Sequence, residues 1–405
     1  MKTTLFILFL FLLVSCKREA KTSDMPAEAA ENRSAVNIPV NPLKEAYFGD
    51  THVHTGWSFD AGLDGAVLTP DDAYRYALGE EVTSNTGAKT RLKRPYDWFL
   101  ISDHSDGMGV INEVIDGNPE MMESEIVAGW NKAFASGEEA QAAAAKSEVV
   151  ILQSTGKLPE QVLDPKWMVG AWNKTIDAAE KFNQPGTFTT FTAYEWTVNA
   201  GGGDNLHRNI IYKEGGDQAR DILPLTTFET QEPKKLWAWM ANYEAQTGDQ
   251  LLAIPHNGNM SNGRMYEEQQ FDGTPMTKEW AEMRAKYERL MELFQYKGQS
   301  EAHPYLSPTD EFANYELWDR GNLILKPKTS KEMWKYEYYR EGLKSGMRIA
   351  QDLGANPFMY GSNSATDTHT GISSVDESES VSYTHLRAHE TGRHISYAVF
   401  CLKRG

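Results

Sequence analysis

The sequence predicts an α/β fold in which a mainly parallel sheet is arranged as a (β/α) barrel. Strand-like apolar runs alternate with helical stretches along the chain, which is the pattern of βα units. Most of these runs adjoin polar or ionisable residues, and a barrel gathers its functional side chains at the carboxyl ends of its strands. The 405 residues are enough for one large domain of this kind.

The predicted strands are short, and most have a histidine or a carboxylate next to them. The first lies in the sequence FGDTHVHTGWS, and the second leads into Asp103 and His104. The third leads into Glu195, the fourth follows His207, and the fifth leads into His256. These strands are expected within residues 48–58, 99–101, 188–193, 209–212, 251–254, 293–294 and 358–361.

Helical stretches separate the strands. Thr69 before Pro70 is a typical N-cap followed by proline in the first turn, so a helix is expected from there to about Gly79. Residues 105–185 are expected to form a helix-rich insertion after the second strand. The other predicted helices lie at about 123–148, 168–182, 233–246, 277–290 and 329–353.

Charge and cysteine content exclude several classes of function. The formal net charge is −17 and no basic stripe is present, which disfavours binding to a nucleic-acid backbone. The two cysteines, Cys16 and Cys401, lie near the ends of the chain. We therefore expect neither a disulfide framework nor a zinc site built from cysteines.

The N-terminus reads as a targeting segment. Lys2 is followed by a ten-residue apolar run that is too short to span a bilayer, as in a signal peptide over residues 1–16. The sequence LVSC resembles the lipobox of bacterial lipoproteins, in which Cys16 becomes the lipidated first residue; a plain secretory signal is the alternative. Residues 17–42 are polar and predict a disordered tether. We expect an exported bacterial lipoprotein, anchored to the membrane at the periplasmic face or the cell surface.

The C-terminus reads as foreign to the fold. Residues 381–391 (VSYTHLRAHET) and 395–402 (ISYAVFCL) resemble a translation of sequencing-library adapters. The native domain is therefore expected over residues 43–380, as a C-terminally truncated barrel, and residues 381–405 are expected to be irregular. The three histidines of this tail carry no weight in the functional argument.

The remaining histidines indicate a metal site. His52 and His54 are two residues apart, so in an extended chain both rings face the same side. Asp367 and His369 repeat this spacing near the other end of the domain. Histidine and carboxylate ligands without cysteine suit zinc, manganese or iron, and the number of candidates favours two or three divalent ions. The seven histidines before residue 381 are His52, His54, His104, His207, His256, His303 and His369, and the acids in position are Asp60, Asp103, Glu195 and Asp367.

In this order, the motifs resemble those of the polymerase and histidinol phosphatase (PHP) superfamily. Within it, the closest resemblance is to DUF3604-like sequences, a bacterial family of unknown function with PHP-like metallohydrolase and arylsulfatase-type members. The resemblance covers about residues 45–375 and implies a distorted (β/α)7 barrel. Asp60 stands where many members of the superfamily carry histidine. The resemblance implies a first ion held by His52, His54, Glu195 and Asp367, a second held by Glu195, His207 and His256, and a third position surrounded by Asp60, His104 and His369.

Such a site predicts a hydrolase acting on a small anionic ester of phosphate or sulfate. Clustered cations lower the pKa of water and offset charge that builds up on the ester. Asp60 or Asp103 could orient the nucleophile, and Asp103 could equally hold a ligand imidazole. Arg208 is the main candidate for binding the anionic ester, with Asn257 and Lys297 as further candidates. Glu292 and Glu316 also lie beside apolar runs, and a structural role is favoured for Glu316.

Two other functions stay open at this point. One is an amidohydrolase-type enzyme acting on amides or lactones, although no lysine sits at a clear strand end to serve as a carboxylated bridging ligand. The other is a non-catalytic binding lipoprotein that keeps metals for structure, although structural sites have few ligands and are closed.

Overall fold

The computed structural model describes residues 46–154, 157–325, 327–373 and 399–400. The chain divides into two units, Met1–Pro39 and Val40–Gly405, and all described residues belong to the second. The predicted signal peptide, tether and lipidation site Cys16 therefore lie outside the described residues. So does the predicted foreign tail, except for the strand β15 (Val399–Phe400).

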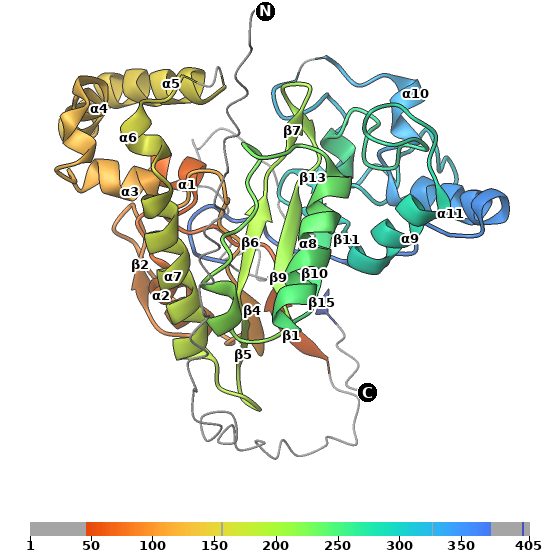
Figure 1. Cartoon of the computed structure of the whole chain (residues 1–405), viewed down its shortest axis with the longest axis horizontal. Helices are drawn as coiled ribbons and strands as arrows, with labels where there is room; N and C mark the ends of the chain where they lie inside the picture. Colours follow the sequence, from red (N-terminus) through yellow and green to blue (C-terminus); the bar gives the residue numbers. More distant parts are fainter. Residues whose placement is uncertain (1–45, 155–156, 326, 374–398, 401–405) are drawn as a thin grey trace, which may run out of the picture. The chain divides into compact units, whose positions relative to one another are not determined.

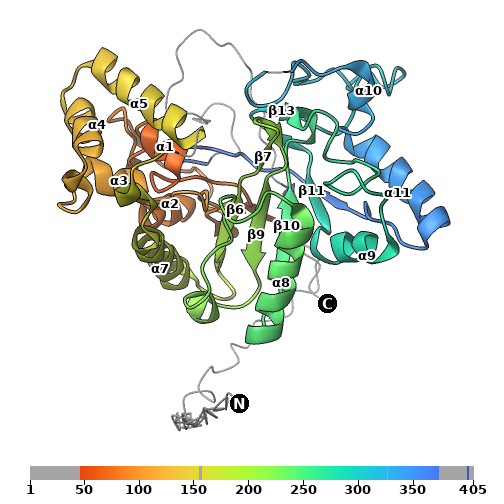
Figure 2. The same cartoon turned by 45° about the horizontal axis from the view of Figure 1, so that its top comes forward.

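Two sheets form the centre of the domain (Figures 1 and 2). The first has the order β15-β1-β4-β5, in which β1 (Tyr47–Asp50), β4 (Trp98–Leu100) and β5 (Thr189–Phe191) run parallel. Strand β15 pairs antiparallel with β1. The second sheet is antiparallel and consists of β6 (Ala193–Trp196), β9 (Arg208–Tyr212) and β10 (Leu251–Pro255).

Isolated bridges link these sheets to a parallel pair, β11 (Leu290–Glu292) and β14 (Gly361–Asn363). His104, beyond the end of β4, bridges Glu195 in β6, and Val53, beyond the end of β1, bridges Thr368. The chain segments around β1 and β14 are thereby neighbours. Between β10 and β11 no ladder is present in the part of the chain that the structure describes. The prediction of an α/β fold is confirmed, whereas a closed (β/α)7 barrel is not, and β9 runs antiparallel to its neighbours.

Helices are present in every stretch predicted to be helical, with shifted ends, and the stretch 329–353 is divided between two of them. Thr69 caps α2 in a capping box with Asp72, as its sequence predicts. The helix expected at 123–148 is two helices, because Gly137 between them has a φ of 72°. The insertion is helical over α3–α7. The helices are α1 (Phe59–Leu63), α2 (Pro70–Ala77), α3 (Val110–Ile115), α4 (Glu125–Ala135), α5 (Glu139–Ser154), α6 (Glu160–Leu163), α7 (Pro165–Phe182), α8 (Pro233–Thr247), α9 (Lys278–Tyr287), α10 (Lys331–Trp334) and α11 (Tyr339–Leu353).

Short elements complete the domain. None of the helices in the described ranges combines the length and apolar character that crossing a bilayer requires. The minor strands and 3₁₀ turns are β2 (Val82–Thr83), β3 (Lys89–Thr90), β7 (Asn199–Ala200), β8 (Asp204–Asn205), β12 (Phe294–Gln295), β13 (Gly298–Gln299), η2 (Met121–Glu123), η3 (Gly216–Ala219) and η4 (Gly258–Met260).

The largest core cluster packs helices against the antiparallel sheet. Trp172 of α7 and Trp237 of α8 are fully buried in this cluster, together with Trp196 of β6. Figure 1 shows α8 lying along β9 and β10. Burial of these large aromatic side chains stabilises the packing of the helices on the sheet. The ends of β1, β4 and β6 carry polar residues.

Candidate metal centre

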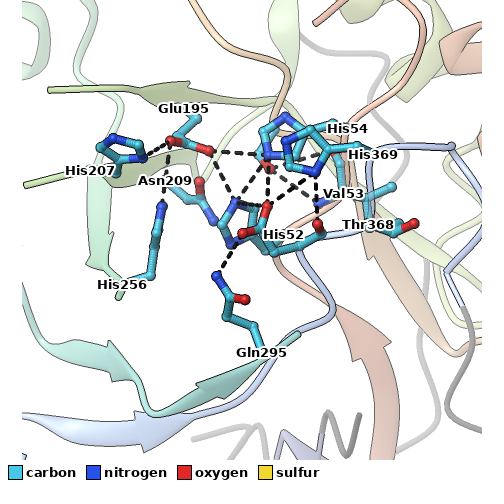
Figure 3. A network of polar contacts seen from close by, with 12 residues as sticks. His52, Val53, His54, Glu195, His207, Asn209, His256, Gln295, Thr368 and His369 are labelled. Carbon is cyan, nitrogen blue, oxygen red and sulfur yellow. Dashed lines mark hydrogen bonds and ion pairs between the residues drawn. The ribbon is translucent and has the colours of Figure 1, made fainter. Parts of the chain in front are cut away.

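The first ligand pair lies just after β1. Here the chain runs beside the segment that follows β14: Asp367 N donates to His52 O at 2.9 Å, and His54 N donates to Thr368 O at 2.8 Å. Asp50 joins the same two segments, because its carboxylate accepts from Thr366 Oγ1 at 2.6 Å. These bonds bring His52 and Asp367, more than 300 residues apart in sequence, into one site. Figure 3 shows the neighbouring His54 beside His369.

Four donor atoms converge at this point. His52 Nε2 lies 3.1 Å from His54 Nε2 and 3.0 Å from Glu195 Oε2. Asp367 Oδ1 lies 3.2 Å from His52 Nε2 and 3.2 Å from His54 Nε2. His54 Nε2 is also 3.2 Å from Glu195 Oε2. The four side chains have relative exposures of at most 1%.

This arrangement fits a metal ion better than a hydrogen-bonded cluster. The two histidine nitrogens form one triangle with Glu195 Oε2 and another with Asp367 Oδ1, each with edges of 3.0–3.2 Å, which suits three ligand atoms of one ion. Asp367 Oδ1 is buried and accepts no hydrogen bond within the described structure. Two imidazole nitrogens and two carboxylate oxygens that face each other this closely need a cation between them to offset their negative charge.

Glu195 connects this group to a second one. Its Oε1, on the other side of the carboxylate, lies 2.8 Å from His207 Nδ1 and 3.5 Å from His256 Nε2. His52, Glu195 and His256 also form a group whose ligand atoms lie within 4.8 Å of one another. Glu195 therefore has the geometry of a bridging ligand between two positions.

A third position lies around Asp60. His104 Nε2 lies 3.2 Å from one Asp60 oxygen, and His369 Nε2 lies 3.1 Å from the other. The ring of His54 packs against both His104 and His369, with centroids 4.4 and 4.2 Å away. The side chain of Asp60 is 48% exposed, so this position faces solvent. Asp60 thus occupies the site in place of the histidine that the resemblance would suggest.

The second ring nitrogen of most of these histidines is held by a neighbour. This arrangement fixes the tautomer and aims the other nitrogen into the cluster, as around known metal sites. Only His256 Nδ1 is without a hydrogen bond in the described structure. The contacts are His52 Nδ1 with Glu292 Oε2 (3.1 Å), His54 Nδ1 with Ser58 Oγ (2.8 Å), His104 Nδ1 with Thr197 Oγ1 (2.5 Å), His207 Nε2 with Asn199 Oδ1 (3.1 Å) and His369 Nδ1 with Asp367 O (2.9 Å).

Burial and charge set the ionisation of the ligands. Burial lowers the pKa of His207 to about 4 and holds the pKa of His52 well below its usual value, so both rings are neutral near pH 7. Desolvation opposes ionisation of Glu195, but His104 and the other neighbouring histidines hold the pKa of its carboxyl well below the usual range. Neutral imidazoles and ionised carboxylates are the forms that bind a metal.

Two predicted catalytic residues, Asp103 and Arg208, bind partners outside the metal cluster. Asp103 is buried and accepts from Thr55 N at 2.6 Å and from Thr55 Oγ1 at 2.7 Å, so it fixes the turn after His54 and holds no ligand imidazole. Arg208 points away from the cluster and pairs with the buried Glu288 at 2.9 Å. The roles predicted for Asp103 in orienting the nucleophile and for Arg208 in binding the ester are not supported by these positions.

The other predicted anion-binding residues support the ligand Asp367 instead. Lys297 Nζ contacts Asp367 Oδ2, and Gln295 Nε2 donates to the same oxygen at 2.6 Å. Gln295 also donates to Asn257 Oδ1 at 2.7 Å. The seventh histidine, His303, stacks on Trp334 with centroids 3.9 Å apart and takes no part in the cluster.

No role was predicted for Glu292, Gln295, Ser58, Thr197 or Asn199. Glu292 was noted only as an acid beside an apolar run, although the ligand-bearing strands share this feature and could have assigned it to the site. The other four are common polar residues, and nothing in their spacing distinguishes them from surface residues.

A family model described as "Protein of unknown function (DUF3604)" matches residues 41–397. The chain belongs to the DUF3604 family. The match includes every residue of the cluster and continues past residue 380 into the segment predicted to be foreign. No curated protein matches the chain. The description of the DUF3604 family specifies no reaction, so the evidence on function comes from the site itself.

Two cavities lie in the DUF3604 domain near its strands. The larger, about 570 Å³, is lined by strand residues such as Leu100, Ile211 and Ile254, and no cluster residue lines it. The smaller, about 300 Å³, is lined by Phe59 and Ser105, the chain neighbours of Asp60 and His104. No residue of the cluster lines the smaller cavity either, and the larger one also reaches a chain neighbour of a ligand, Thr51 next to His52.

Proposed function

We propose that this chain is a metal-dependent hydrolase of the PHP type, which uses two or three divalent ions of zinc, manganese or iron to activate water against small phosphate or sulfate esters. The observation that carries the proposal is the convergence of four ligands: the Nε2 atoms of His52 and His54 lie 3.0–3.2 Å from each other and from one carboxylate oxygen each of Glu195 and Asp367. The bridging position of Glu195 and the solvent-facing Asp60 favour a multinuclear, accessible site over a closed structural one.

The ions and the residues around them have different roles in the proposed reaction. Divalent ions in such a site lower the pKa of water and offset negative charge on the phosphoryl or sulfuryl group. Lys297 and Gln295 hold the outer oxygen of Asp367, which keeps Oδ1 aimed at the histidines. Desolvation opposes ionisation of Asp60, but His104 and His369 hold its pKa well below the usual value. An ionised, half-exposed Asp60 can accept a hydrogen bond from a water and orient it.

Chelation and a substrate panel test the proposal. We expect the metal-loaded protein to hydrolyse an aryl phosphate, a phosphate diester or an aryl sulfate, to lose this activity with a chelator, and to regain it with Zn²⁺, Mn²⁺ or Fe²⁺. Hydrolysis of lactones or amides alone would favour the amidohydrolase alternative, and metal binding without any turnover would favour a binding protein. Glu195 argues against the former, because it already supplies the bridging carboxylate that a carboxylated lysine would provide.

The order of the strands favours a barrel. Thr192 alone separates β5 from β6, so we count the two as one strand. The ladders and the two bridges then give seven strands in the order β14, β1, β4, β5–β6, β9, β10 and β11, and among the described residues only the neighbours β10 and β11 lack a pairing with each other. We propose a distorted (β/α)7 barrel in which β10 and β11 are the closing pair. An experimental structure with another element between these two strands would exclude it.

We also propose that the protein is exported and anchored through lipidated Cys16. The apolar run followed by LVSC motivates this. In cell fractionation, the wild-type protein should partition with membranes and Cys16→Ser should leave them. A wild-type protein that stays in the aqueous fraction would contradict the anchor.

A further inference from the structure

The larger cavity, of about 570 Å³, lies against the inner faces of the strands. In β4, Trp98 and Leu100 line it, whereas Phe99 between them packs in the core cluster of α2 and α7. Successive side chains of a strand point to opposite faces of a sheet, so the cavity occupies the side of β4 that faces away from those helices. Its volume is within the range of about 300–1,000 Å³ that is usual for small-molecule sites.

The inner part of the cavity is apolar. Leu100, Ile211 and Ile254 belong to one small core cluster, and all three are buried and line the cavity. The partly buried Leu252 and Leu290 pack against this cluster and line the cavity as well. Protein interiors are normally close-packed, so these side chains leave apolar surface that is not covered by other side chains. Such surface offers water few polar partners and favours an apolar ligand.

Charged side chains surround the outer part of the cavity. Lys213, Lys286 and Arg289 line it and are exposed. Glu244 is the one carboxylate among the described lining residues, and it pairs with Lys286 at 2.6 Å. Lys213 lies 3.4 Å from Glu214. Arg289 donates from Nε to Lys286 O at 3.2 Å and forms no ion pair within the described part of the chain. The mouth of the cavity therefore holds a guanidinium group that is available to an anion.

This mouth lies at the opposite end of the strands from the metal cluster. Gln250 immediately precedes β10 and Arg289 immediately precedes β11, and both line the cavity. At the other ends of these strands, His256 follows β10 and Glu292 ends β11. Both of these residues belong to the metal centre, where His256 faces Glu195 and Glu292 holds a ligand imidazole. The cavity is therefore a site separate from the cluster.

We propose that this cavity binds a free single-chain amphiphile with an anionic head group, such as a fatty carboxylate. The apolar chain lies against the inner faces of the strands, where it covers the exposed surface of Leu252 and Leu290. The carboxylate pairs with Arg289 at the mouth, because a guanidinium group matches the two oxygens of a carboxylate. This site is additional to the proposed hydrolase activity and does not depend on it.

Calorimetry with alkyl carboxylates below their micelle concentrations tests the proposal. We expect octanoate, decanoate and dodecanoate to bind the metal-loaded full chain with affinities that rise by roughly three- to fourfold for each added methylene. Decyltrimethylammonium, which has a similar chain but a cationic head group, should bind more weakly than decanoate. Binding of decanoate should persist after a chelator has removed the metal ions, because no cluster residue lines the cavity.

Two variants separate the chain from the head group. Leu252→Trp places an indole in the cavity and should abolish the dependence of affinity on chain length. Leu163→Trp is its matched control, because Leu163 is 49% exposed and does not line this cavity. Arg289→Gln, at an exposed position that should not affect folding, should weaken decanoate by roughly two- to fivefold without weakening decyltrimethylammonium.

Several results would overturn the cavity assignment. They are an absence of binding, affinities that do not rise with chain length, and equal effects of Leu252→Trp and Leu163→Trp. If Leu252→Trp does not fold, equal affinities of wild type and Arg289→Gln for decanoate overturn it instead. Binding that a chelator abolishes would mean that the carboxylate binds the metal ions, which also contradicts the assignment. All of these results would leave the hydrolase proposal standing.

Discussion

Glu195 is the residue on which the two halves of the cluster depend. Its Oε2 faces His52 and His54, and its Oε1 faces His207. In the sequence, Glu195 is a single acidic residue at the end of an apolar run. Its residue type and its position were sufficient to predict it as a metal ligand. Which oxygen meets which histidine depends on the pairing of β6 with β9 and on the bridge to His104, and no local pattern predicts these contacts.

Glu292 provides the first prediction at this scale. It is buried and holds His52 Nδ1, so Glu292→Gln should keep the fold but weaken metal binding by about 10- to 100-fold. Competition with a fluorescent chelator would measure the affinity. Glu244→Gln, which alters a carboxylate paired with Lys286 at 2.6 Å, is the control and should keep wild-type affinity. Equal affinities for all three proteins would mean that Glu292 does not support the ligand.

Glu337 gives a pH dependence that is independent of the cluster. Burial raises the pKa of its carboxyl to about 9. The folded state therefore keeps a proton that the unfolded chain loses above about pH 4.5, so stability from this group is greatest at low pH and is lost as the pH rises towards 9. Glu337→Gln should remove this loss.

Thermal unfolding at several pH values checks the sign. The melting temperature of Glu337→Gln should exceed that of the wild type by a margin that grows between pH 6 and pH 9. The difference should correspond to a few kcal/mol at the upper end, on the order of what a shift of several pKa units allows. Parallel curves for the two proteins would show that Glu337 ionises normally.

At the scale of elements, the alternation of side chains along β9 explains one failed prediction. His207 and Asn209 face the cluster side, where Asn209 Nδ2 donates to Thr51 O at 3.0 Å. Arg208 lies between them and faces the opposite side, against Glu288. The period of two in a strand was sufficient to predict this, because neighbours of a ligand in a strand point away from it.

Helix starts were predictable because their signals are local. Thr69 caps α2 as expected, with its hydroxyl accepting from Asp72 N at 3.3 Å. Thr69→Ala should lower the free energy of unfolding by about 1 kcal/mol in urea titrations. Thr86→Ala, in an exposed turn, should change it by less than about 0.5 kcal/mol. A loss from Thr69→Ala no larger than that of the control would show that the cap does not stabilise α2.

At the scale of the whole molecule, the sequence predicted that residues near the two ends of the domain lie close together. It did not predict the contacts that hold them there. The matching pairs His52-x-His54 and Asp367-x-His369 required this proximity. The structure adds Asp50, whose buried carboxylate accepts from Thr366 Oγ1 at 2.6 Å and from Ser373 Oγ at 2.5 Å. Long-range closure of this kind depends on packing of the whole sheet, which local patterns do not specify.

Asp50→Ala tests this closure. It removes several buried hydrogen bonds and leaves their donors unpaired, so the free energy of unfolding should fall by about 3 kcal/mol. Metal affinity should fall with it, because the two ligand-bearing segments lose their link. Urea unfolding and chelator competition measure the two effects. Unchanged stability and affinity would show that other contacts suffice to hold these segments together.

Elemental analysis of the purified full chain measures whether Glu195 joins two metal positions. After equilibration with Zn²⁺ or Mn²⁺ and removal of free ions, the wild-type protein should hold at least two ions per chain. Glu195→Gln should lose more than one of them while its circular dichroism stays unchanged. A wild-type protein with less than one ion per chain, or a Glu195→Gln variant with full metal content, would show that Glu195 does not join two metal ions.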